Sequence, residues 1–119
     1  MATTELQATV REHDGAAVID LSGDVDASAE DALNAAYAEA TGTGSNTVVL
    51  NFEGTEYINS TGIALIVALL AQARASQVEV KAFGLSDHYR EIFEITRLAD
   101  FMTIADDEQR ALSGAEGRQ

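Results

Sequence analysis

Hydrophobic and polar positions alternate at the start of the chain. Leu6, Ala8 and Val10 are separated by polar residues, which predicts a half-exposed strand, and residues 17–21 form a second, mostly apolar strand. The turn-forming sequence His13-Asp14-Gly15 lies between them. These two strands are therefore expected to form a hairpin.

After the hairpin, apolar residues recur at helical spacing, which predicts a helix. Ser28 is a suitable N-cap, with Asp31 at the spacing of a capping box. The apolar residues that recur at helical spacing predict the buried face of this helix: Leu33, Ala36, Tyr37 and Ala40. Residues 41–44 end the helix, and residues 47–52 are nearly all apolar or β-prone, as in a central strand covered on both faces.

The second half of the chain repeats this alternation of helix and strand. The elements predicted here are a loop over 53–57, a strongly apolar helix over 61–76 preceded by Ser60, a strand over 78–83, a helix capped by Ser86 with Tyr89, Ile92 and Phe93 facing inward, a short extended piece over 101–104, and a terminal helix over 106–113. Residues 114–119 are expected to be a frayed tail.

Strands separated by helices imply parallel crossovers within one sheet. Together with the first hairpin, they predict an α/β fold with a mixed sheet of about four to five strands packed by helices. The helices are expected mainly on one face, leaving the other partly open. The 119 residues fit a single domain with a core over about 5–113, and 46% of them are hydrophobic, enough to bury a core.

The charge balance narrows the classes of partner. Twenty acidic residues face seven basic ones, for a net charge of −13, which opposes direct binding of nucleic acid or anionic lipid. Cysteine is absent, so disulfides and thiolate chemistry are excluded. The start shows no basic region followed by an apolar run, and the longest apolar run, 63–71, is too short for a membrane span. A cytoplasmic protein is expected.

Residues 57–62 connect the central strand to the most apolar helix, and residues 22–26 follow the second strand. In open α/β sheets, sites form beyond the carboxyl ends of the strands, so Asp24 and Asp26 are expected near Ser60. At a helix N-terminus, a phosphate on Ser60 would be tolerated by the fold while adding roughly −1.5 to −2 charges. A simple N-cap role for Ser60 is the alternative.

The helix over 61–76 is apolar around most of its circumference. Ile63, Ile66, Val67 and Leu70 form one stripe, whereas Leu65 and Leu69 lie elsewhere on the helix. This pattern indicates either deep burial or a second face for a partner.

Taken together and in order, three segments resemble the STAS domain of anti-sigma-factor antagonists. The resemblance covers nearly the whole chain, about residues 5–113. The family pattern at the third segment is Asp-Ser-(Ser or Thr)-Gly at the start of an apolar helix. The segments are Leu21-Ser22-Gly23-Asp24-Val25-Asp26, Val49-Leu50-Asn51-Phe52 and Ile58-Asn59-Ser60-Thr61-Gly62-Ile63.

The resemblance implies partner switching. The chain would bind an anti-sigma factor serine kinase and so release a sigma factor; the kinase would use ATP to phosphorylate Ser60 and break the complex, and a phosphatase would restore it. Asp26 matches the acidic position near the serine, Thr61 lies beside it, and Gly62 matches the glycine needed for tight packing. Asn59 replaces the usual Asp, so phosphorylation could be slower or lost. From the residues alone, Thr61 stays open as the acceptor.

Other classes of function remain as alternatives. A STAS protein could act unphosphorylated, as a scaffold or sensor, or as a subunit of a transport complex. An enzyme is not expected. Ile58 occupies the position where a Gly-x-Ser-x-Gly nucleophile elbow has its first glycine, and the two histidines, His13 and His88, are expected at the surface, where they would not complete a catalytic triad. Asp24 and Asp26 without further ligands predict no metal site, and no cofactor is expected.

Overall fold

The structure, a computed structural model, describes residues 5–13 and 15–117 and contains one five-stranded mixed sheet. The spatial order of the strands follows the chain, β1-β2-β3-β4-β5, with β1 antiparallel to β2 and the other neighbours parallel. This confirms the predicted mixed α/β sheet and its hairpin. The strands are β1 (Gln7–His13), β2 (Ala16–Val25), β3 (Thr47–Ile58), β4 (Glu79–Phe83) and β5 (Thr103–Ile104).

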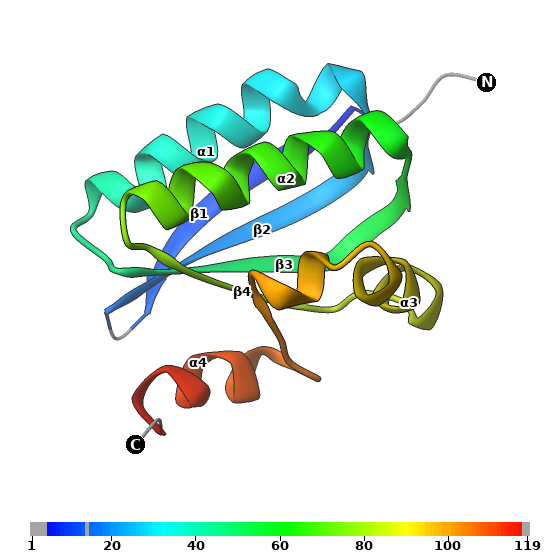
Figure 1. Cartoon of the computed structure of the whole chain (residues 1–119). Coiled ribbons are helices and arrows are strands. Elements are labelled where there is room, and N and C mark those ends of the chain that lie inside the picture. Colours follow the sequence, from blue (N-terminus) through cyan, green and yellow to red (C-terminus); the bar gives the residue numbers. More distant parts are fainter. Residues whose placement is uncertain (1–4, 14, 118–119) are drawn as a thin grey trace.

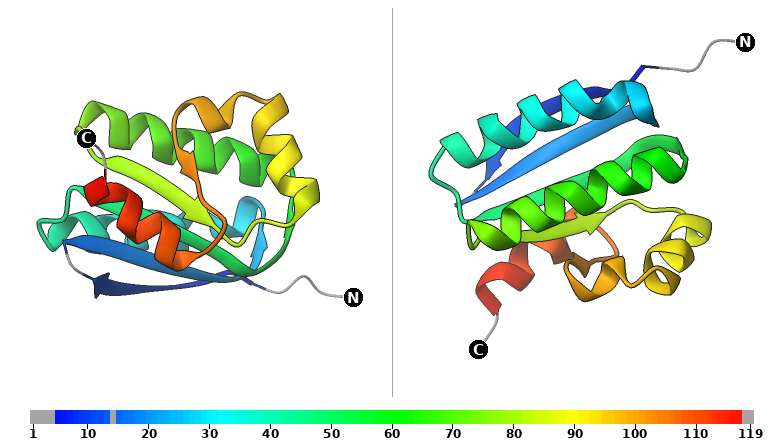
Figure 2. Two further views of the ribbon diagram at one scale, coloured as in Figure 1. Left: turned by 90° about the horizontal axis from the view of Figure 1, so that it is seen from below. Right: turned by 45° about the horizontal axis from the view of Figure 1, so that its top comes forward.

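Helices cover the two faces of the sheet unequally. In Figure 1, α1 and α2 lie side by side across one face, whereas α4 lies on the opposite side of the sheet; the two views of Figure 2 agree. The helices are α1 (Glu30–Gly42), α2 (Ser60–Ala75), α3 (Asp87–Ile95) and α4 (Glu108–Gly117), with short 3-10 turns η1 (Ala27–Ala29) and η2 (Leu98–Asp100).

The main core lies between the sheet and the α1–α2 layer. The buried residues of α1 are the four that helical spacing predicts, because this period alone places them on one side. From α2, Ile66, Leu69 and Leu70 are buried in the same core, so part of the apolar circumference of α2 is explained by burial. Phe93 of α3 packs edge-on against Phe52 of β3, with ring centroids 6.0 Å apart.

The second face is partly covered, as expected. Ala111 of α4 packs in a small apolar cluster with Val18, Val49 and Phe83. Lys81, only 2% exposed, donates a hydrogen bond from Nζ to the carbonyl oxygen of Ala111, at 3.1 Å. These contacts hold α4 on the sheet.

Three element boundaries differ from expectation. β3 continues through the predicted loop 53–57, because two register shifts let it stay paired with β2 as far as Val25 and Ile58. The first helix of the α1 layer does not start from Ser28 as its N-cap; η1 precedes it and α1 begins at Glu30. At the C-terminal end, α4 runs to Gly117, past the predicted end at Ser113, so the predicted frayed tail over 114–119 is wrong for 114–117.

The predicted hairpin turn lies partly outside the described residues. Asp14 is not described, and β1 ends at His13 while β2 begins at Ala16. Gly15 has φ +85, a conformation that suits glycine in a tight turn.

Candidate phosphorylation site at the start of α2

The candidate site lies where two parallel strands end side by side. Val25 at the end of β2 pairs with Ile58 at the end of β3. Beyond this pair, one chain segment enters η1 through Asp26 and the other enters α2 through Asn59. Figure 1 shows that α1 and α2 begin at the same end of the sheet. The pairing of the strands therefore sets the starts of the two segments next to each other, at one rim of the sheet.

Asn59, rather than Ser60, is the N-cap of α2. Its Oδ1 accepts a hydrogen bond from the backbone N–H of Gly62 at 2.8 Å, and its carbonyl oxygen accepts one from Ile63 N–H at 2.9 Å. Its own N–H donates to the carbonyl oxygen of Val25 at 3.2 Å. Asn59 thus caps α2 and ties it to β2, and the alternative in which Ser60 is only an N-cap is wrong.

Gly62 brings α2 into direct contact with the β2 backbone. A Cβ atom on Gly62 would lie 2.0 Å from the carbonyl oxygen of Val25, which no real contact allows. The tight packing that the resemblance implied for this glycine is present, and only glycine permits it. The start of α2 therefore has a fixed position relative to the rim.

Because Asn59 caps α2, the hydroxyl side chains in the first turn of this helix are not needed to cap it. Ser60 is the first residue of α2, Thr61 the second, and both are exposed. Their N–H groups belong to the first turn, which has no intrahelical partners for them. The positive end of the helix dipole and these N–H groups together favour an anion at this point.

The two predicted carboxylates take different positions. Asp26 caps η1: its Oδ1 accepts hydrogen bonds from Ser28 N–H at 3.0 Å and Ser28 Oγ–H at 2.6 Å. Since η1 lies against α2, Asp26 belongs to the same rim as Ser60. Asp24 pairs with Tyr57 across β2 and β3.

Strand alternation then separates Asp24 from the serine. Its neighbour Val25 points into the core beneath α1 and α2, so the side chain of Asp24 falls on the opposite face of the sheet. The structure thus brings together Asp26, Asn59, Ser60, Thr61 and Gly62, and it places Asp24 away from them.

Two aromatic residues at the rim were not predicted from the sequence. Tyr57, next to the rim, is 48% exposed, a large apolar side chain open to a partner. Tyr89 of α3 accepts a hydrogen bond on its hydroxyl oxygen from Ile58 N–H at 3.0 Å, which fixes the end of β3. Tyr57 could have been noticed in the motif segment, whereas the contact of Tyr89 depends on where α3 packs.

The charges around Ser60 are acidic. Asp26 lies on the same rim as Ser60, and residues 22–28 and 57–62 contain no lysine or arginine. A phosphate on Ser60 would meet helix N–H groups but no cation from these segments, so most of its charge would remain available to repel a partner. Within 5–13 and 15–117, no group of three or more His, Asp or Glu side chains is placed to hold a metal ion.

A family model and the similar proteins found by comparison agree on one family. The family model described as "Mlab, STAS domain" matches residues 8–104. BtrV of Bordetella bronchiseptica, a predicted anti-sigma factor antagonist, is 28% identical over 106 residues, which cover 89% of this chain and 91% of that protein. The anti-sigma-B factor antagonist of Staphylococcus aureus is 34% identical over 61 residues, covering 51% of this chain and 56% of that protein.

Solved structures share the fold. An anti-sigma factor antagonist from Mycobacterium paratuberculosis superimposes with a TM-score of 0.81 at 19% identity, covering 94% of this chain and 95% of that one. SpoIIAA of Bacillus in its phosphorylated form gives a TM-score of 0.68 at 23% identity, covering 91% and 98%. None of the helices in the described ranges has the length and apolar character needed to cross a membrane.

Proposed function

Because this chain belongs to the STAS domain family, we propose that it is an anti-sigma factor antagonist that acts by binding and not by catalysis. Its partner is an anti-sigma factor serine kinase, and binding of that kinase releases a sigma factor. The similar proteins that carry the name of anti-sigma factor antagonist support this role. Such a protein works in the cytoplasm and needs no cofactor of its own.

The observation that carries the proposal is the exposed hydroxyl of Ser60 on a helix start that Asn59 already caps. The kinase transfers the γ-phosphoryl group of ATP to Ser60 Oγ, releasing ADP and the hydroxyl proton. The helix N-terminus stabilises the new anion, so the fold is kept. The added charge, roughly −1.5 to −2, weakens the complex by repulsion and desolvation, and a phosphatase reverses the change.

Asn59 is compatible with this switch. Its side chain provides the cap to Gly62 N–H without a charge, and the kinase supplies the catalytic groups for the transfer. The missing carboxylate affects the rate of phosphorylation and not the geometry of the acceptor. Thr61 is exposed on the same turn, so the choice between the two hydroxyls belongs to the kinase and is tested by variants.

Asn59 also favours one alternative function, that of a STAS protein that is never phosphorylated. A STAS protein with Asn at this position could bind its partner without ever being phosphorylated, as a scaffold, a sensor or a subunit of a transport complex. In that case the surface around Ser60 would still contact the partner, and Ser60→Ala would not change the activity of the protein in the cell.

A binding titration with the anti-sigma serine kinase of the source organism tests the proposal. The wild type and Ser60→Ala should bind equally, whereas Ser60→Asp should bind at least about tenfold more weakly, because it places a charge in the contact. Gln109→Asp puts the same charge on an exposed position of α4, on the other face of the sheet, and serves as the control. Equal binding by Ser60→Asp and the wild type would contradict the switch.

A further inference from the structure

An apolar groove runs between α2 and the segment that follows α3. Its volume is about 260 Å³, and most of the surface that it exposes is apolar, although Arg74, Thr96 and Arg97 also line it. The α2 side is formed by Val67, Leu70 and Ala71, and the other side by Leu98 and Phe101. Leu70 and Leu98 are buried at its base, whereas Val67 and Phe101 are exposed.

The groove collects exposed large apolar side chains. Within the described residues, four such side chains are exposed, and two of them, Val67 at 45% and Phe101 at 53%, line this groove. A third, Ile95, immediately precedes the lining residue Thr96 in the chain. The fourth is Tyr57, next to the rim at the start of α2. Apolar surface thus lies at both ends of α2, as expected of a surface that contacts a partner.

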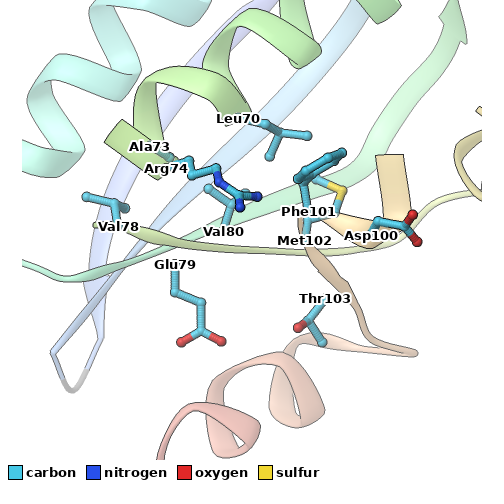
Figure 3. A pocket seen from close by; sticks show the side chains of 10 residues that line it. All are labelled: Leu70, Ala73, Arg74, Val78, Glu79, Val80, Asp100, Phe101, Met102 and Thr103. Atoms are coloured by element: carbon cyan, nitrogen blue, oxygen red, sulfur yellow. The ribbon is translucent and has the colours of Figure 1, made fainter. Parts of the chain in front are cut away.

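Arg74 adds a cation to this surface. Its guanidinium lies over the ring of Phe101, 5.4 Å from the centroid, and Figure 3 shows the two side chains together at the rim of a neighbouring hollow. Among the described residues, Arg74 forms no ion pair, whereas the nearby Arg97 is paired with Asp100 at 2.7 Å. In a chain of net charge −13, an unpaired arginine beside an apolar groove suits a partner that brings a carboxylate.

The groove is continuous with the candidate phosphorylation site. Ser60, Ala64, Val67, Ala71 and Arg74 are all exposed and recur every three or four residues, so they share one side of α2. At 1.5 Å per residue, Val67 lies about 10 Å and Arg74 about 21 Å from Ser60 along the helix. A partner segment lying along α2 would contact both regions at once.

We propose that this groove is a second anchor for the anti-sigma factor partner, and that it takes an apolar segment of that partner carrying a carboxylate for Arg74. The inference rests on the proposed function. Because the groove is far from Ser60, it contributes the same factor to the affinity whether or not Ser60 is charged. Phosphorylation then removes one anchor and leaves the other.

The test is a titration of the purified kinase against Arg74→Glu and Val67→Asp, each alone and combined with Ser60→Asp. Both positions are exposed, and thermal unfolding will verify that the variants fold. Each groove variant should weaken binding about tenfold, as expected when a central contact is lost. In the combined variants, the two fold-changes should multiply. Arg110→Glu makes the same charge reversal on α4, on the other face of the sheet, and should bind like the wild type.

The outcomes separate this inference from the proposed function. If Ser60→Asp weakens binding while both groove variants bind like the wild type, the groove is not an anchor and the switch stands. If only the groove variants weaken binding, the anchor stands and the switch at Ser60 does not. A kinase that fails to bind the wild type contradicts both. Sedimentation that shows a wild-type dimer, converted to monomer by Arg74→Glu, would make a second copy the occupant and overturn the inference.

Discussion

The α carbon of Gly62 in α2 lies so close to the carbonyl oxygen of Val25 in β2 that a methyl group on Gly62 would stand 2.0 Å from it. The same carbonyl accepts a hydrogen bond from Asn59 N–H. One backbone oxygen at the end of β2 therefore sets both the position of the helix cap and the distance of closest approach. Ser60 lies between these two contacts, so its place on the rim depends on them.

Gly62→Ala should destabilise the protein by about 1–3 kcal/mol, because the new methyl group forces α2 away from β2 and strains the Asn59 to Val25 hydrogen bond. Urea unfolding measures the change. Gly42→Ala is the matched control, since nothing lies within 4 Å of a Cβ there, and it should gain about 0.5 kcal/mol. Equal stabilities for the two alanine variants would show that the close contact is not real.

Asn59 and Ser60 should respond differently to alanine. Asn59→Ala removes the acceptor for Gly62 N–H and should cost about 1 kcal/mol of unfolding free energy. Ser60→Ala removes an exposed side chain that does not cap the helix and should change stability by less than about 0.5 kcal/mol. Asn59→Asp keeps the acceptor and adds a charge at the positive end of the dipole, for a gain of about 0.3–1 kcal/mol. A larger loss for Ser60→Ala than for Asn59→Ala would reverse the assignment of the cap.

Acid should lower the stability of the protein by protonating Asp20, which pairs with Arg11 on the second face of the sheet. Arg11 donates to both carboxylate oxygens, at 2.6 and 3.0 Å, and this hydrogen bonding lowers the pKa of Asp20, helped by Asn51 and opposed by partial burial. Because the pKa in the folded state lies below the unfolded value of about 3.9, the stabilisation is present above about pH 5 and is lost as pH falls through the folded pKa.

The check is the unfolding free energy of the wild type and Asp20→Asn between about pH 2 and pH 7. The advantage of the wild type should shrink as the solution is acidified, and Arg11→Gln should remove the same pH dependence. If the curves of the wild type and Asp20→Asn stay parallel across this range, Asp20 contributes no such linkage.

The sequence predicts those features that depend on local spacing. The buried face of α1 follows from the helical period, and the cap of α3 is correct because Ser86 Oγ accepts a hydrogen bond from Tyr89 N–H at 3.3 Å. The parallel pairing of β2 with β3 and of β3 with β4 follows from the alternation of strands and helices, whereas the spatial order of the strands was not predicted. Each of these depends on residues a few positions apart, or on connection rules that hold for most folds.

Features that depend on contacts between residues far apart in the chain could not be predicted from the sequence. Residues 53–57 look like a loop, yet they extend β3 because β2 shifts register to follow them. Asn59 and Ser60 are both competent caps, and the carbonyl of Val25 decides between them. The face on which Asp24 lies follows from β2 continuing in strand conformation through Val25, which faces the core, and the groove beside Arg74 depends on where η2 packs.

The most direct test of the central claim is the site of phosphorylation. The protein would be incubated with ATP and the anti-sigma serine kinase of the source organism, and then analysed by intact-mass spectrometry with peptide mapping, alongside Ser60→Ala and Thr61→Ala. The account predicts one added phosphate, located on Ser60, present in Thr61→Ala and absent in Ser60→Ala. A wild type that binds the active kinase and gains no phosphate, or that carries it on Thr61, would contradict the account.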